Sequence, residues 1–326
     1  AVADYYRRRA EGGVGLILTE GTTINRQAAS NDSGIPNFHD PESLAGWANV
    51  VSAVHAAGGR IAPQLWHQGL VRQAGTGPYP NAPTEGPSAT VPGSKAMTDT
   101  DIAETIDAFA TAAAAAKKIG FDAVELHGAH GYLIDEFLWS GTNSRTDGYG
   151  GDAIARTRFA TEVISAVRAA LGPNFPLIFR FSQWKGQDYD ARLAETPKEL
   201  DALLTPLADA GVDVFHASTR RFWQSEFEGS DLNLAGWTRK LTGVPTISVG
   251  SVSLGGEDFF GQIRGDSTGA PIASLDDLVQ RMSDDEFDLI AVGRALISNP
   301  DWANLVQTGN ADQLRPFEKK MLATLD

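Results

Sequence analysis

The sequence predicts an α/β protein, a TIM (β/α)8-type barrel that lacks the N-terminal first strand. Apolar segments of strand length alternate with amphipathic segments along the whole chain. The apolar segments are continuous, as in parallel strands that are buried on both faces. A length of 326 residues suits one barrel and no linker divides it, so we expect a single domain over residues 1–326.

Seven segments are predicted strands, because each is rich in Val, Ile, Leu or Phe and follows a turn. They are Val14–Glu20, Arg60–Trp66, Asp122–His127, Pro176–Ser182, Val212–Ala217, Val244–Gly250 and Asp288–Gly293. A barrel of eight strands opens on a strand, whereas this chain opens on a helical segment, DYYRRRAEGG. An open barrel would expose two unpaired edges, so we expect the sequence to be incomplete at this point.

Helices are predicted between the strands, and three long loops follow strand ends. Amphipathic patterns cover Pro41–Ala57, Thr98–Lys118 and Asp152–Ala170. Residue types that begin helices stand at Asp40-Pro41, Thr98 and Thr196-Pro197. Loops 68–98, 218–232 and 251–274 follow the carboxyl ends of strands, which is the catalytic face of a barrel, so we expect them around the site.

The composition excludes several classes of function. There is no cysteine, which removes disulfides, cysteine-bound zinc and iron–sulfur clusters. The net charge of −14 argues against nucleic acid or an anionic membrane as a partner. No segment reaches the roughly 20 apolar residues of a membrane-spanning helix. We therefore expect a cytoplasmic enzyme that binds small molecules, with a homo-oligomer as one option for its assembly.

Polar residues gather at the carboxyl ends of the predicted strands, which converge on one pocket in a barrel. Three of the six histidines lie at or just beyond strand ends, and a fourth follows closely: His67, His127, His216 and His130. Gln64 and Arg180 also lie in the last part of apolar strands. A buried arginine needs an anionic or electron-rich partner, either a ligand or a structural ion pair. His67 and His216 are as compatible with a structural role as with a functional one.

The pair His127 and His130 is the strongest catalytic candidate. A metal site would need a third and a fourth ligand, and no carboxylate cluster supplies them, so we predict no metal. Packing in the core is a second reading, although the neighbouring GAHGY is rich in glycine. The third reading is a pair of N–H donors that stabilises negative charge on one substrate oxygen. Tyr132 could then give a proton to a basic carbanion.

The last two predicted strands suggest a phosphate site. ISVGSV places Gly250 and Ser251 at one strand end, and AVGRAL places Gly293 and Arg294 at the next. In barrels, the final two βα loops often bind phosphate through backbone N–H groups. Each motif alone is a weak indication. Because the two motifs occupy equivalent positions in successive strand–helix units, together they indicate a phosphorylated ligand.

The stretch ELHGAHGYLIDEFLWSGTNSRTDGYGG, Glu125–Gly151, resembles the old yellow enzymes, FMN-dependent ene-reductases on a TIM barrel. It is similar to their motif H-x-x-[HN]-x-Y followed by N-x-R-x-D-x-Y-G-G. Supporting matches are GLILTEGT, PQLWHQG, FRFS, VGSV and VGRALISNPDW. The resemblance implies FMN as cofactor, NADPH or NADH as reductant, and an activated alkene as substrate.

The resemblance also implies residue roles. His127 and His130 would bind the carbonyl or nitro oxygen of the substrate, Tyr132 would protonate it at carbon, and Trp66 would border it. The residues implied for FMN are Gly21, Thr22, Gln64, His127 and Arg180 at the ring, and Gly250, Ser251, Gly293 and Arg294 at the phosphate. The loop STRRFWQSEFEG matches no pattern of the family.

Two other functions remain open. A flavin-free phosphate-binding barrel, such as a lyase or aldolase, would share the phosphate site but usually needs a strand-end lysine. We expect no lysine at the strand ends of this chain. An FMN-binding protein without ene-reductase turnover is the second alternative, and absence of the first strand from the protein would favour it.

Overall fold

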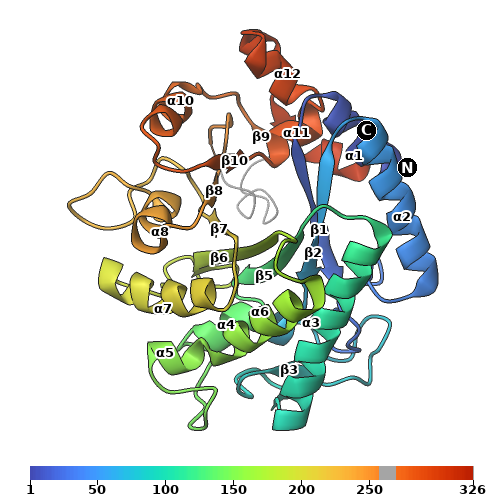
Figure 1. The fold of residues 1–326 in the computed structure, drawn as a ribbon, viewed down its shortest axis with the longest axis vertical. Coiled ribbons are helices and arrows are strands. Elements are labelled where there is room, and N and C mark those ends of the chain that lie inside the picture. The colour runs from blue at the N-terminus through green and yellow to red at the C-terminus, as the bar shows by residue number, and fades with distance from the viewer. Residues whose placement is uncertain (257–268, 326) are drawn as a thin grey trace.

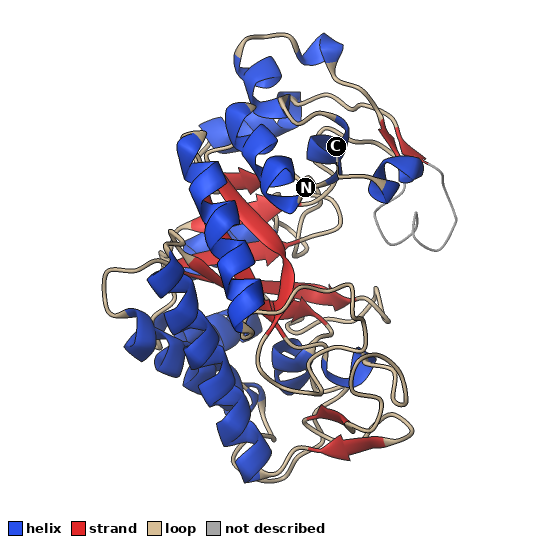
Figure 2. Ribbon diagram, turned by 90° about the vertical axis from the view of Figure 1, so that its right-hand side faces the viewer, coloured by secondary structure: helices blue, strands red, loops and turns tan. Residues whose placement is uncertain are grey.

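The computed structural model describes residues 1–256 and 269–325. Seven parallel strands form one curled sheet, in the order β1-β2-β5-β6-β7-β8-β10 (Figures 1 and 2). Their bounds are β1 Leu16–Thr23, β2 Arg60–Trp66, β5 Val124–His130, β6 Leu177–Lys185, β7 Val214–Ser218, β8 Thr246–Val249 and β10 Leu289–Ala291. All seven predicted strands are present. Sequential strands are neighbours in the sheet, which is the connectivity of a TIM barrel.

The helices lie around the outside of this sheet (Figure 1). They are α1 Val2–Glu11, α2 Pro41–Ala56, α3 Asp99–Ile119, α4 Leu133–Leu138, α5 Ala153–Arg156, α6 Arg158–Leu171, α7 Pro197–Asp209, α8 Leu234–Thr242, α10 Asp276–Ser283, α11 Arg294–Ser298 and α12 Trp302–Gln307. The predicted start at Thr98 is confirmed, because Thr98 and Asp101 exchange side-chain and backbone hydrogen bonds. Thr196 caps α7 in the same position, with Pro197 as the first helical residue.

Three strands, β1, β5 and β6, run well past their predicted ends, because pairing with a neighbour continues past the apolar core. β1 reaches Thr23, which pairs with Trp66 after a register shift between Leu18 and Gly21. β5 and β6 continue together past Gly128 until His130 pairs with Lys185. The expectation that no strand ends in lysine is therefore wrong. The sequence pattern placed the ends of all three strands where their apolar residues end.

The two outer strands of the described sheet are β1 and β10, which each have one neighbour in it. The sheet is curled but open between them, as expected for a barrel without its first strand. Most buried apolar side chains form one large cluster, whose fully buried members include Phe109, Phe159 and Phe215. A second, small cluster contains Ala62, Ala123, Ile178 and Ile247. No helix in the described residues is both long and apolar enough to cross a membrane.

The three long loops all follow strand ends. Loop 68–98 is ordered by the short helix η1 Gly69–Val71 and by the strands β3 Thr84–Gly86 and β4 Ser94–Ala96. Within loop 251–274, residues 257–268 lie outside the described part of the chain. The rest of it pairs β9 Gly269–Ala270 with β11 Phe317–Glu318. Two further short helices near the C-terminus are η2 Ala311–Gln313 and η3 Lys319–Ala323.

Candidate active site

A row of polar residues crosses three neighbouring strands near their middle. His127 of β5 is in register with Arg180 of β6, and Arg180 is in register with His216 of β7. The row continues to Ile247 of β8. Residues in register on parallel strands point to the same face of the sheet, so these side chains share the interior of the barrel. Residues separated by about forty positions in sequence are thus side by side.

His127, His130 and Tyr132 form one cluster of rings. The centroid of His127 lies 5.0 Å from that of His130 and 4.9 Å from that of Tyr132, with the rings edge to face. The backbone N–H of Ala129 donates to His127 Nδ1 over 3.3 Å. The proton of the neutral ring is therefore on Nε2, which is free to donate to a ligand. Burial and then Arg180 lower the pKa of His127 to about 3, so the ring is neutral at pH 7.

His130 is held from both sides. Its ring stacks on Trp184 with centroids 4.5 Å apart, and its Nε2 lies 2.8 Å from Ser218 Oγ. Arg180 donates to the same Ser218 oxygen over 3.3 Å, which leaves the Ser218 hydroxyl hydrogen available to His130 Nε2. In that arrangement the ring proton of His130 is on Nδ1. Burial, followed by the charge of Arg180, lowers the pKa of His130 well below its ordinary value.

The turn that carries these rings is fixed by a buried ion pair. His130 and Gly131 both have left-handed backbone, with φ of 65° and 82°. The Gly131 N–H donates to Asp135 over 2.7 Å, and Asp135 pairs with Lys185 over 2.7 Å. Both side chains of the pair are fully buried. A non-glycine residue adopts left-handed backbone at a cost, so this pair stabilises a turn that otherwise would relax.

Tyr132 begins α4 and is mostly buried. Its ring meets that of Trp66 edge to face, with centroids 5.1 Å apart. Burial raises the pKa of the Tyr132 phenol above its ordinary value, and the charge of Arg180 opposes this only in part. The phenol is therefore protonated at neutral pH, as a proton donor must be.

Gln64, Glu125 and His216 form a buried hydrogen-bond network below this cluster. Gln64 Nε2 donates to one Glu125 oxygen over 2.6 Å, and His216 Nδ1 lies 2.7 Å from the other. Burial alone raises the pKa of the Glu125 carboxyl, but its hydrogen bonds and Arg180 outweigh burial and lower it. Burial lowers the pKa of His216, so the ring is neutral and donates from Nδ1. Glu125 is an anion held by three neighbours.

The residues expected near the flavin ring on β1 and β2 pack tightly together. Thr22 Oγ1 donates to the carbonyl of Gln64 over 2.9 Å. Gly21 lies under Trp66, because a Cβ at this position would come within 3.3 Å of the indole ring. The absence of a side chain at Gly21 thus allows Trp66 to reach Tyr132.

The residues expected at the phosphate lie together on the other side of the open sheet. Arg294 donates to Ser251 Oγ over 3.2 Å, although the two are 43 positions apart. Gly250 and Ser251 follow β8, and Gly293 immediately precedes α11. A side chain at Gly293 would meet nothing within 4 Å, so the backbone there is accessible to a ligand. This arrangement could bind an anion through Arg294 and backbone N–H groups.

One cavity of about 840 Å³ joins the two groups. His130, Arg180, Trp184 and His216 line it at one end, and Gly250, Ser251, Gly293 and Arg294 line it at the other. Thr19 and Glu20 of β1 also border it, whereas Gly21, Thr22, Gln64, Trp66, His127 and Tyr132 are not part of its lining. Its volume is within the roughly 300–1,000 Å³ of small-molecule sites.

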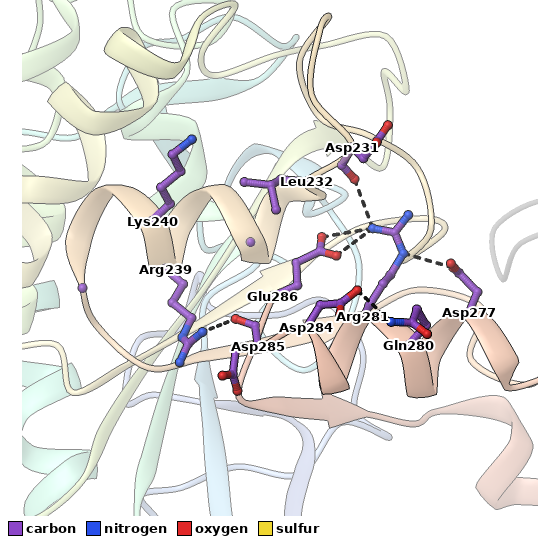
Figure 3. A pocket seen from close by; sticks show the side chains of 12 residues that line it. Asp231, Leu232, Arg239, Lys240, Asp277, Gln280, Arg281, Asp284, Asp285 and Glu286 are labelled. Carbon is purple, nitrogen blue, oxygen red and sulfur yellow. Dashed lines mark hydrogen bonds and ion pairs between the residues drawn. The ribbon is translucent and has the colours of Figure 1, made fainter.

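A second hollow, of about 780 Å³, lies between α8 and α10 and away from these residues (Figure 3). Arg281 crosses it and donates to Glu286, Asp277 and the carbonyl of Asp231 (Figure 3). Arg281 also donates to the carbonyl of Trp223. The polar groups of this hollow thus bond one another and tie loop 218–232 to α10, which is a structural role.

Sequence reasoning missed three residues of the site. Glu125 was not singled out, although a carboxylate inside the apolar segment FDAVEL carries the same signal as Arg180 in IFRFS. Trp184 and Ser218 contact His130 from β6 and β7, and nothing in their local sequence indicates this contact. Of the strand-end histidines, His67 is fully buried beside Glu85 in loop 68–98 and lies outside the cavity.

Known proteins resemble the chain over most of its length. The NADH:flavin oxidoreductase / NADH oxidase family matches residues 1–266. An NADPH dehydrogenase of Clostridium acetobutylicum is 33% identical over 325 residues, covering 97% of this chain and 87% of that protein. An NADH oxidase of Thermoanaerobacter brockii is also 33% identical over 325 residues, covering 96% of this chain. The chain spans about half of that relative, 46% of its length.

A solved structure shares the fold. A single-residue mutant of morphinone reductase, in complex with tetrahydroNAD, superposes with a TM-score of 0.79 at 28% identity. The match covers 97% of this chain and 82% of that one. The predicted class of fold, the TIM barrel, is thereby confirmed.

Proposed function

Because the chain belongs to the NADH:flavin oxidoreductase / NADH oxidase family, the old yellow enzymes, we propose that it is an ene-reductase. Its substrates would be α,β-unsaturated carbonyl or nitro compounds, reduced at the activated C=C bond with NADPH or NADH as the electron source. The observation that carries the proposal is the cluster of His127, His130 and Tyr132, two neutral imidazoles and a protonated phenol within one group of rings.

The residues present fit FMN, the cofactor of the family. Arg180 Nε and His216 Nε2 are buried polar atoms with no hydrogen-bond partner among the described residues. Both residues line the cavity, whose far end carries Arg294 and the accessible backbone of Gly293. A long molecule with a polar ring edge and an anionic tail meets these requirements. Gln64 and Arg180 would bind the ring, with Gly21 and Thr22 beside it, and Gly250, Ser251, Gly293 and Arg294 would bind the phosphate.

Bound FMN supplies the hydride, and the protein supplies position, charge and a proton. His127 donates from Nε2 and His130 from Nδ1 to the carbonyl or nitro oxygen of the substrate, where negative charge develops. Two neutral donors stabilise that charge without giving up a proton themselves. Tyr132 transfers its phenolic proton to the carbon next to that group. Trp66 borders the substrate and holds the Tyr132 ring in place.

A visible spectrum tests the proposal against its two alternatives. We expect purified protein with FMN to be yellow, to bleach with NADPH and to recolour when 2-cyclohexenone is added. Protein that stays colourless after addition of FMN would favour a flavin-free phosphate-binding lyase. Lys185 does not support that alternative, because its ammonium group is fully buried and paired with Asp135. Yellow protein that bleaches but does not recolour would favour a flavoprotein without this turnover.

The donor pair has its own test, the double variant His127→Ala with His130→Ala. We expect weaker binding of phenols and slower reduction of enones, with FMN still bound, because the imidazoles act on the substrate oxygen. The matched control is His55→Ala, a partly exposed histidine of α2 that pairs with Asp122 on the surface. Enone kinetics that are the same in the double variant and the control would contradict the role of the pair.

A further inference from the structure

Glu125 determines the hydrogen-bonding direction of two neighbouring side chains. It is fully buried, and its ionised carboxylate can only accept hydrogen bonds. Gln64 and His216 must therefore both donate to it, over 2.6 Å and 2.7 Å. Donation from His216 Nδ1 fixes the neutral ring in one tautomer, in which Nε2 carries a lone pair. The carboxylate thus makes His216 Nε2 a hydrogen-bond acceptor.

The residue that carries this acceptor, His216, lines the cavity. His216 is 1% exposed, and its Nε2 has no hydrogen-bond partner among the described residues. A buried acceptor without a partner costs about 1–3 kcal/mol, which a ligand donor would recover. Its neighbour Arg180 presents donors only, so the two side chains offer opposite polarity to a ligand.

The place of His216 in the sheet indicates which part of a ligand it meets. β7 lies between β6, which carries Arg180, and β8, after which Gly250 and Ser251 follow. A molecule that extends from Arg180 to Arg294 must therefore pass β7. In FMN the part between the ring and the phosphate is a chain of hydroxyl groups, and a hydroxyl is a donor that His216 Nε2 can accept. The ring edge, by contrast, would lie at Gln64 and Arg180.

We propose that His216 is a further FMN-binding residue, which accepts a hydrogen bond from a hydroxyl of the chain between ring and phosphate. Glu125 is the positioning residue that holds His216 in the accepting tautomer. The proposal rests on the proposed function, because it takes FMN as the ligand of this cavity. In this proposal Glu125 and His216 contribute to binding of FMN and not to proton transfer to the substrate.

A flavin panel tests the contact without measuring turnover. The apoprotein is titrated with FMN, riboflavin and lumiflavin, which carries a methyl group in place of the hydroxylated chain. His216→Asn keeps a donor to Glu125, because the Asn amide nitrogen occupies the place of Nδ1, but it has no counterpart of Nε2. We expect this variant to bind FMN and riboflavin about threefold to tenfold more weakly, as for loss of one neutral hydrogen bond. Its affinity for lumiflavin should equal that of the wild type.

The matched control is His55→Asn on the outer helix α2, whose three affinities should be unchanged. Equal losses for riboflavin and lumiflavin in His216→Asn would overturn the proposal, and so would no loss for either. Wild-type protein that binds none of the three flavins would instead contradict the proposed function. The two failures are thus distinguishable.

Nitrogen NMR of histidine-labelled apoprotein tests the role of Glu125. We expect His216 in the wild type to carry its proton on Nδ1. In Glu125→Gln the neutral amide can donate as well as accept, so the ring should populate both tautomers and riboflavin should bind more weakly. A proton on Nε2 in the wild type, or an unchanged tautomer in Glu125→Gln, would overturn the assignment.

Discussion

Single residues of the site owe their chemistry to burial. The phenol of Tyr132, whose ordinary pKa near 10 already keeps it protonated at pH 7, has that pKa raised further by burial. His127 is neutral because burial and Arg180 lower the pKa of its ring. The same desolvation therefore prepares a proton donor and an uncharged hydrogen-bond donor side by side. Sequence reasoning can name these residues, but their protonation states depend on what surrounds them.

Tyr132→Phe should slow the reduction of 2-cyclohexenone by about hundredfold or more, because it removes the proposed general acid. Reduction of the bound flavin by NADPH should not change, since no proton from Tyr132 is needed there. Anaerobic stopped-flow spectroscopy measures the two half-reactions separately. Tyr79→Phe, at an exposed position, is the control. Equal rates of enone reduction in the two variants would rule out Tyr132 as the proton donor.

His127 should make the protein less stable in acid. The pKa of His127 is about 3 in the folded protein and near 6.5 in the unfolded chain, so the unfolded chain binds the proton more tightly. The folded state keeps its full stability above pH 6.5 and loses it as the pH falls toward 3. A shift of this size corresponds to about 5 kcal/mol at the acid limit.

Urea denaturation at pH 7, 6 and 5 measures this dependence. His127→Asn should lose less stability between pH 7 and pH 5 than the wild type does. His55→Asn, on the surface, should follow the wild type. The same slope for His127→Asn and the wild type would show that His127 does not titrate in this way.

Among the elements, the turn between β5 and α4 depends on an ion pair between α4 and β6. Asp135 follows the turn in sequence, whereas Lys185 ends β6 and is 50 positions away. The pair also orients Gly131, the residue between His130 and Tyr132. Tertiary pairing thus fixes the local backbone on which two catalytic candidates depend.

Lys185→Met or Asp135→Asn should each destabilise the protein by about 3–5 kcal/mol, because each leaves a buried charge without its partner. The double variant should recover most of this loss, since no net charge remains buried and Asn can still accept from Gly131. Chemical denaturation gives the free energies of unfolding. Arg158→Gln removes an exposed ion pair with Glu162 and should cost at most about 0.5 kcal/mol. Additive losses in the double variant would mean that the pair is not coupled.

In the whole molecule, the cavity connects the two sides of an open sheet. Residues that end β6 and β7 form one end, and residues that follow β8 and β10 form the other. A ligand that fills the cavity contacts both sides at once. Ligand binding should therefore stabilise the fold as well as enable chemistry.

FMN at a hundred times its dissociation constant should add about 2.7 kcal/mol to the free energy of unfolding. This corresponds to a rise in Tm of about 4 °C, measured by differential scanning fluorimetry. Riboflavin, which lacks the phosphate, should give a smaller rise at the same concentration. Arg294→Gln should remove most of this difference, because a charge-assisted hydrogen bond contributes about 1.5–3 kcal/mol. Equal shifts for both flavins in the wild type would contradict a phosphate site at Arg294.

Some residues of the candidate site could be placed from the sequence, and others could not. That His127 and Arg180 lie on strands and Gly293 just after one could be predicted, because a repeated strand–helix pattern aligns the strands of one sheet whatever the details of packing. The ends of β5 and β6 could not, because their last residues pair with each other rather than continue an apolar run. Lys185 was missed as a strand end for this reason. Ser218 and Trp184 were missed because their contacts with His130 cross from one strand to another.

The sequence by itself determined the class of fold, the family and which polar residues lie on or next to its strands, since these depend on periodicity and on residue types at fixed spacing. Only the tertiary structure decided how those residues are charged and held. The direction of each hydrogen bond around Glu125, the tautomer of His216 and the turn at His130 all depend on distant strands. The protonation states and hydrogen-bond directions of these side chains depend on their burial and on their hydrogen-bond partners. The side chains acquire that burial and those partners only when the sheet has folded.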